Sequence, residues 1–266
     1  MEEHFLPVPY LPEWRRIRVL LPENYQQDQW THYPVLYMHD GQNVFYSKES
    51  YSGHSWKIIP TIKHHKALPK LIIVGIDNAG VRRLDEYAPW KTDTGSTPET
   101  MHAGGLGFEY GKWVVETVKP FIDSHYRTKP DRTNTLLAGS SMGGMITAFM
   151  GAKYPDIFGH LGVFSLASWF SEKAFLTFCH QYILNQASKV FIQVGTKEGD
   201  EVDSHFISNM NQAYIDSTLR YYQALLRTGH PLDNIRLKLM ANEIHHEMHW
   251  ADHFVEFLHF SLLENE

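Results

Sequence analysis

Residues 133–144 read TNTLLAGSSMGG, and a helical pattern begins immediately after them. The apolar run 133–138 is typical of a buried strand, so the glycine-rich segment indicates a strand-to-helix turn. Ser141 has a glycine two residues before it and another two residues after it, which is the G-x-S-x-G pattern. Small neighbours permit the strained turn that exposes a serine hydroxyl at a helix N-terminus, where the helix dipole favours negative charge. Ser141, rather than the adjacent Ser140, is the candidate nucleophile.

The chain on either side of this turn alternates between strand-like and helix-like patterns. The runs expected to be strands are 16–21 (an edge strand), 34–38, 70–77, 133–138, 160–165, 190–195 and 235–240. The runs expected to be helices are 108–126, 142–154, 172–184, 206–227 and 249–263. Such alternation predicts an α/β fold with a mostly parallel central sheet and helices on both faces. No linker divides the chain, so we expect one domain over residues 1–266.

Composition excludes several classes of protein. The 24 basic residues against 30 acidic residues give a net charge of −6, so we expect no nucleic-acid partner and no anionic membrane surface. The single cysteine excludes an intrachain disulfide and a thiolate metal site. The longest strongly apolar run is about six residues, far below the ~20 of a membrane span. Acids after Met1 and prolines in the following stretch are unlike a secretory signal, so we expect a cytoplasmic protein.

A histidine cluster follows the last expected strand and is the place to look for a general base. A serine nucleophile needs a base, and the base needs an orienting acid. Residues 243–250 read EIHHEMHW and contain His245, His246 and His249. In hydrolases with a G-x-S-x-G turn the chain order is serine, acid, histidine, so a base is expected here. The residues alone do not choose among the three histidines.

The orienting acid is expected at the end of the preceding strand. The segment 195–200 after that strand reads GTKEGD, in which Glu198 and Asp200 are both plausible acids. Asp203 is a third choice. The alternative for each is a solvated loop carboxylate, and the residues alone leave the choice open.

A metal interpretation of the histidine cluster fails on spacing. The metalloprotease motif H-E-x-x-H is absent, because His246 and His249 are separated by only two residues. His245, His249 and His253 do recur every fourth residue, but on a continuous helix the outer two would lie ~12 Å apart. We therefore expect no catalytic metal and no cofactor.

Five stretches together give the chain a family resemblance. They are 37–43 (YMHDGQN), 74–78 (VGIDN) with Arg82, Arg83 and 86–87 (EY), the turn 139–144, 194–198 (VGTKE) and His245-x-Glu247-x-x-Trp250. In this order they resemble the "putative esterase" family of the α/β-hydrolase superfamily. That group holds esterase-D-like, feruloyl, acetylxylan and siderophore esterases and the mycolyltransferases, and the chain looks most like its cytoplasmic bacterial branch.

The resemblance implies an α/β-hydrolase fold and a serine esterase that acts on a small-molecule ester through an acyl-enzyme on Ser141. The family pattern implies His245 as the base, five residues before a tryptophan, and Glu198 as the acid, two residues after Gly-Thr. It implies backbone N–H groups of Gln42 (or Gly41) and of Met142 as the oxyanion hole. An acyltransferase with the same triad and a non-catalytic binding protein on the same scaffold are the alternatives; the oligomeric state is unknown.

Loop aromatics and two arginines are candidates for the substrate side. Trp169, Trp56 and Trp90 are expected to contact substrate, with Phe45 and Tyr87 as further loop aromatics. Arg82 and Arg83 could bind a substrate carboxylate, but we expect them to pair with Asp85 or Glu86 and fix the loop.

Overall fold

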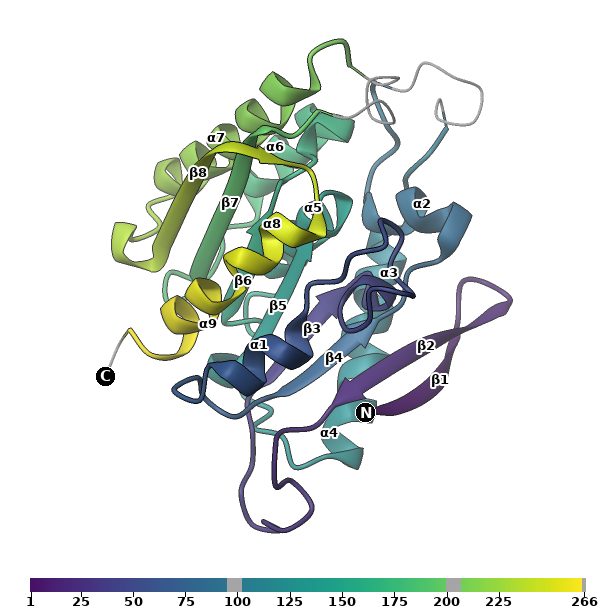
Figure 1. Ribbon diagram of the computed structural model, residues 1–266. Helices are drawn as coiled ribbons and strands as arrows, with labels where there is room; N and C mark the ends of the chain where they lie inside the picture. The colour runs from purple at the N-terminus through teal and green to yellow at the C-terminus, as the bar shows by residue number, and fades with distance from the viewer. Residues whose placement is uncertain (95–101, 200–206, 265–266) are drawn as a thin grey trace.

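The computed structural model describes residues 1–94, 102–199 and 207–264 (Figure 1). Within these residues one sheet contains eight strands in the order β1-β2-β4-β3-β5-β6-β7-β8. Their bounds are β1 Glu2–Val8, β2 Glu13–Leu20, β3 Val35–His39, β4 Ile72–Ile76, β5 Thr135–Ser140, β6 His160–Phe164, β7 Lys189–Lys197 and β8 Ile235–Ile244. The strands from β4 to β8 run parallel, whereas β1 and β2 are antiparallel to their neighbours. The mostly parallel sheet expected from the sequence is confirmed.

The edge of the sheet differs from the expectation. The run 16–21 lies in β2, and β1 pairs outside it, so β1 is the edge strand. The alternation of β1 is incomplete in sequence because Pro7 interrupts it, and proline is tolerated on an edge strand. Leu6 and Val8 of β1 are nevertheless buried, while Pro7 between them and Phe5 before them are exposed.

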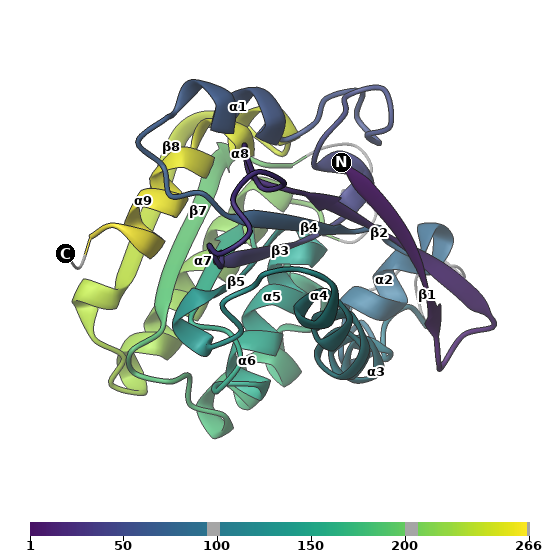
Figure 2. The ribbon, with the colours of Figure 1, turned by 90° about the horizontal axis from the view of Figure 1, so that it is seen from below.

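Helices cover both faces of the sheet (Figure 2). Their bounds are α1 Ile58–His64, α2 Arg83–Tyr87, α3 Gly107–Trp113, α4 Lys119–His125, α5 Met142–Lys153, α6 Glu172–Gln181, α7 Met210–Arg227, α8 Glu247–Asp252 and α9 Phe254–Leu262. Helices α1, α8 and α9 lie on one face, and α3 to α7 lie on the other (Figures 1 and 2). The helix expected over 108–126 is divided by a π-helical turn at Val114–Val118, next to Pro120, which has no N–H to donate.

Two apolar cores result from the strand pleat. Successive side chains of a strand point to opposite faces, so Val35 and Tyr37 pack in one core while Leu36 and Met38 pack in the other. All four are buried because the sheet is covered on both sides. In parallel sheets the loops that bear chemistry gather at the carboxyl ends of the strands.

Candidate active site

The turn between β5 and α5 holds Ser141 in a strained backbone conformation. Ser141 has φ 61° and ψ −126° and precedes the first residue of α5. Its N–H donates to the Phe164 carbonyl of the neighbouring strand at 2.9 Å. A Cβ on Gly139 would lie 2.6 Å from the carbonyl oxygen of Gly143, so the turn tolerates only glycine there. The glycine pattern seen in the sequence is therefore a steric requirement of the turn that exposes the serine.

Glu198 and His245 are hydrogen-bonded to each other. Glu198 Oε2 lies 2.7 Å from His245 Nδ1, and the glutamate side chain has 0% exposure against 11% for the histidine. The other oxygen, Oε1, accepts the Ser165 hydroxyl at 2.7 Å and the Gly195 N–H at 2.5 Å. Trp250 Nε1 in turn donates to Ser165 Oγ at 2.7 Å. A buried carboxylate that accepts several hydrogen bonds is fixed in place, and it can hold the imidazole in one tautomer and orientation.

The rival histidines have other partners. His246 accepts the Met248 N–H at 3.2 Å and thereby caps α8. Its pKa is lowered by burial. His249, the other rival, lies in α8, where its N–H donates to the His246 carbonyl at 3.1 Å. His253, the next histidine along the chain, has its Nε2 2.9 Å from Glu243 Oε1. Asp200 and Asp203, the rivals of Glu198, lie outside the described residues.

A tyrosine that the sequence did not single out lies beside the serine. The Tyr214 hydroxyl of α7 is 3.4 Å from Ser141 Oγ, and the tyrosine has 0% exposure. Its ring centroid is 4.6 Å from that of His245. No hydrogen bond joins Ser141 to His245 within the described residues, although catalytic hydrogen bonds often form only in the substrate complex. Helix α7 thus brings a phenol to both the nucleophile and the expected base.

The three tryptophans expected to bind substrate have different surroundings. Trp169 is close to the serine, because its ring centroid is 5.7 Å from that of Tyr214. Trp56 is 2% exposed and packs edge-on against Phe164 at 4.9 Å, so its contacts are those of a core side chain. The expectation that it contacts substrate stays a prediction.

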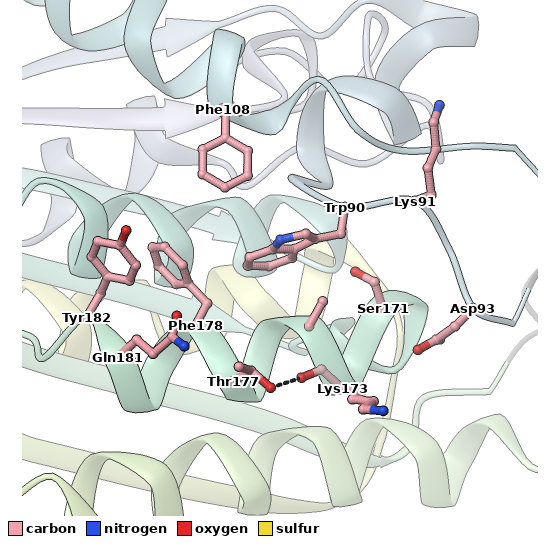
Figure 3. A pocket seen from close by; sticks show the side chains of 11 residues that line it. Trp90, Lys91, Asp93, Phe108, Ser171, Lys173, Thr177, Phe178, Gln181 and Tyr182 are labelled. Carbon is pink, nitrogen blue, oxygen red and sulfur yellow. Dashed lines mark hydrogen bonds between the residues drawn. The ribbon is translucent and has the colours of Figure 1, made fainter.

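Trp90 lines a cavity of about 580 Å³ between its own loop and α6 (Figure 3). Phe108, Phe178 and Tyr182 share this cavity with polar side chains from α6. The described residues that line it do not include Ser141, Glu198 or His245. Trp90 therefore packs in an aromatic cluster with Phe108 and Phe178 and is not brought to the serine by its contacts.

The segment expected to supply an oxyanion amide is a single 3-10 turn, Gly41–Asn43, directly after β3. Asp40 precedes it with a left-handed backbone, φ 55°. A Cβ on Gly41 would lie 2.7 Å from the backbone carbon of Gly75, so the turn packs tightly against β4. The Gln42 side chain points back to the same strand end, because its Oε1 accepts the Asn78 N–H at 3.1 Å. Met142, the other expected donor, is the first residue of α5.

Arg83 pairs with Asp40, not with Asp85 or Glu86 as expected. Its Nε and Nη2 donate to the two Asp40 oxygens at 2.7 and 2.8 Å, and Asn78 Nδ2 donates to Oδ1 at 2.6 Å. Burial alone would raise the pKa of Asp40, but the Arg83 guanidinium holds it below its ordinary value. Asp40 Oδ2 is 3.3 Å from the position of a Cβ on Gly143, so this carboxylate touches the serine turn.

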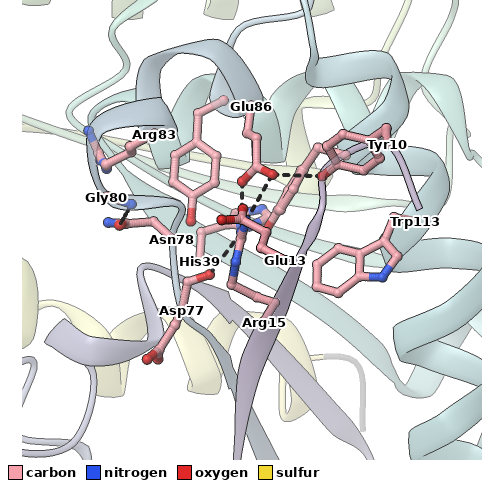
Figure 4. Close-up of polar contacts among 12 residues, drawn as sticks. Tyr10, Glu13, Arg15, His39, Asp77, Asn78, Gly80, Arg83, Glu86 and Trp113 are labelled. Carbon is pink, nitrogen blue, oxygen red and sulfur yellow. Dashed lines mark hydrogen bonds and ion pairs between the residues drawn. The ribbon is translucent and has the colours of Figure 1, made fainter. Parts of the chain in front are cut away.

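Glu86 has a different partner because α2 turns it toward the N-terminal hairpin (Figure 4). Its Oε2 accepts Arg15 Nη1 of β2 at 2.7 Å, and its Oε1 accepts the Tyr10 hydroxyl at 2.8 Å. Asp85 accepts the Gly104 N–H at 2.9 Å, and Arg82 is exposed. Arg15 and Tyr10 of the β1–β2 hairpin thus hold α2 through Glu86. Arg83 of the same helix contacts Asp40, directly after the carboxyl end of β3.

The sequence of the chain is similar to those of known proteins. The "Putative esterase" family model matches residues 9–224. The chain belongs to this esterase family. It is 27% identical over 244 residues to the uncharacterized protein YbbA of Bacillus subtilis, covering 92% of this chain and 91% of that protein. The family assignment makes the chain a carboxylic-ester hydrolase.

Solved structures share the fold of this esterase. An IroE-like serine hydrolase from Shewanella oneidensis superposes with a TM-score of 0.73 at 21% identity, covering 97% of this chain and 79% of that chain. A ferulic acid esterase superposes with a TM-score of 0.71 at 18% identity, covering 98% of this chain and 96% of that chain. The α/β-hydrolase fold is therefore confirmed. In the described part of the chain, no helix is both long and apolar enough to cross a membrane.

Proposed function

We propose that this esterase cleaves small-molecule carboxylic esters through an acyl-enzyme on Ser141, with His245 as general base and Glu198 as orienting acid. The observation that carries this proposal is the 2.7 Å contact between a fully buried Glu198 and Nδ1 of His245. That contact directs the other ring nitrogen, Nε2, away from the acid, where it can serve the serine. The strained conformation of Ser141 at the start of α5 is the second support.

The reaction follows from these groups. His245 Nε2 accepts the Ser141 proton as Oγ attacks the ester carbonyl, and Glu198 stabilises the imidazolium that forms. The N–H groups of Gln42 and Met142 are the proposed donors to the tetrahedral oxyanion; losing one such donor typically costs ~3 kcal/mol. His245 then protonates the departing alcohol, and a water attacks the acyl-enzyme by the reverse sequence of proton transfers.

The Asp40–Arg83 pair supports the proposed oxyanion hole. Asp40 connects β3 to the turn that carries Gln42, and its carboxylate contacts the serine turn at Gly143. Because Arg83 and Asn78 hold that carboxylate from the other side, the two proposed donors are fixed relative to each other. Preorganised donors of this kind stabilise charge without reorganising during the reaction.

On the substrate side Trp169 is the best supported of the three tryptophans. It is 5% exposed and packs edge-on against Tyr214, so it can form one wall for the acyl or alcohol group.

We also propose a cytoplasmic location. Cys179 is buried, and burial raises the pKa of its thiol to about 12, so the thiol is unreactive and the chain has no second cysteine to pair with it.

A panel of nitrophenyl and methylumbelliferyl esters with graded acyl chains tests the proposal, with a serine-reactive fluorophosphonate as an independent probe. We expect turnover of at least one short or medium acyl ester and loss of that turnover after fluorophosphonate treatment. Transfer of the acyl group to an added alcohol in preference to water would identify an acyltransferase instead. Failure of the probe to label the protein would contradict the proposed nucleophile.

A further inference from the structure

Tyr214 is placed where the chemistry of the proposed reaction needs a hydrogen-bond donor. Its hydroxyl lies 3.4 Å from Ser141 Oγ, and its side chain is fully buried. A tyrosine hydroxyl carries one proton that it can donate and also accepts hydrogen bonds. A buried phenol this close to the nucleophile can reach two oxygens of the reaction. One is the serine oxygen that attacks the ester carbon, and the other is the alcohol oxygen that leaves it.

The surroundings of the ring indicate which side of the reacting carbon the phenol serves. The Tyr214 ring is tilted by 37° against the His245 ring, with centroids 4.6 Å apart. Trp169 also packs edge-on against the tyrosine, with centroids 5.7 Å apart and an interplanar angle of 83°. The base must reach the oxygen of the departing alcohol to protonate it. A phenol that packs against the base therefore lies beside the same oxygen.

We propose that Tyr214 is a further catalytic residue, whose hydroxyl donates a hydrogen bond to the leaving-group oxygen of the ester. This inference rests on the function proposed above. In the step concerned, the bond between the carbonyl carbon and the alcohol oxygen breaks, and its electron pair passes to that oxygen. The His245 imidazolium transfers its Nε2 proton to the same oxygen. Tyr214 keeps its own proton throughout and only stabilises the charge that develops before proton transfer is complete.

This role predicts an effect that depends on the leaving group. An alkoxide develops much negative charge on oxygen, so it needs both the proton and the hydrogen bond. A nitrophenolate spreads its charge into the ring and leaves readily without help. A hydrogen bond to a charged oxygen is worth about 10- to 100-fold in rate. A structural role of the tyrosine would instead slow both kinds of ester equally.

The test compares Tyr214→Phe with the wild type on two esters of the same acid, an ethyl ester and a 4-nitrophenyl ester. The values of kcat/KM are measured for both, because kcat/KM reports on formation of the acyl-enzyme. We expect Tyr214→Phe to lose about 10- to 100-fold on the ethyl ester and less than about threefold on the nitrophenyl ester. The matched control is Tyr221→Phe, a buried tyrosine on the same helix whose ring packs against Phe175. That control should change neither value.

Each other outcome has a defined meaning. Equal losses on both esters, or no loss on either, would overturn the proposed role of Tyr214. Thermal unfolding is followed for both variants, and if Tyr214→Phe does not fold, Tyr214→Met is read in the same way, because it also lacks the donor. If the wild type hydrolyses neither these nor the panel esters, the proposed function fails and not this inference alone, so the two failures are distinguishable.

Discussion

The Glu198 carboxylate lies 2.7 Å from Nδ1 of His245 and is shielded from solvent at the end of β7. Three groups fix the glutamate in this position: His245 itself, the Gly195 N–H and the Ser165 hydroxyl. Because the carboxylate is held on both oxygens, it can rotate little, and the imidazole it contacts is confined to one orientation.

Glu198→Gln should lower kcat by about two to four orders of magnitude with little change in KM. The amide has nearly the same size, but it lacks the charge that stabilises the imidazolium, and it can favour the wrong tautomer of His245. Ground-state binding does not use that charge, so the loss falls on kcat. Asp200→Asn, two residues further along the chain, is the matched control, and its kcat should be near that of the wild type. If Asp200→Asn is inactive while Glu198→Gln stays active, the orienting acid is Asp200 and not Glu198.

His245→Ala should be nearly inactive, whereas His246→Ala should keep most of its activity. His246 caps α8 through the Met248 N–H and packs edge-on against His54, and loss of such a cap costs about 1 kcal/mol of stability. The two variants are compared by kcat/KM and by thermal midpoint. Loss of activity in His246→Ala at unchanged stability would contradict the assignment of the base.

Arg83→Lys should lower kcat by about tenfold and leave KM almost unchanged. Lysine keeps the charge but cannot make the two hydrogen bonds from Nε and Nη2 to Asp40, so the turn bearing Gln42 loses its fixed position. Arg82→Lys, at the exposed neighbouring position, serves as the control. A rise in KM with unchanged kcat would indicate instead that Arg83 binds the substrate directly.

The buried His39 should make stability fall with acid. Burial lowers its pKa to about 3, from about 6.5 in an unfolded chain. Between these values the unfolded state binds a proton that the folded state does not, so the free energy of unfolding decreases as pH falls below about 6.5, by up to about 1.4 kcal/mol per pH unit. Urea unfolding at pH 7, 6 and 5 measures the slope. His39→Gln should show a flatter dependence; an unchanged slope would mean that other groups cause it.

The parallel core and the serine turn were predictable from sequence because both depend on local patterns. Short apolar runs between amphipathic helices are expected to form buried parallel strands, and the glycines around Ser141 are required by its strained turn. The family resemblance, not periodicity, led from the histidine cluster to His245. The edge strand β1 was missed because Pro7 breaks its alternation.

Contacts between distant segments were not predictable. Ser165 and Tyr214 are ordinary residues in sequence, and only the packing of β6 and α7 brings them to Glu198 and Ser141. Arg83 pairs with Asp40, 43 residues earlier in the chain, whereas Glu86, its near neighbour, pairs with Arg15. The spacing of charges along the sequence predicts ion pairs between neighbours in the chain. It does not predict a pair between residues that only the tertiary fold brings together.

The central claim is that Ser141 carries the acyl group, and Ser141→Ala tests it most directly. Alanine removes the nucleophilic oxygen while making only a small change in the turn. On the best ester of the panel, we expect kcat to fall by about 10⁶, as is common when a triad nucleophile is lost. The fluorophosphonate adduct found on the Ser141 peptide of the wild type should also disappear. A folded Ser141→Ala enzyme that keeps more than a few per cent of wild-type activity, or an adduct on another residue, would contradict the account.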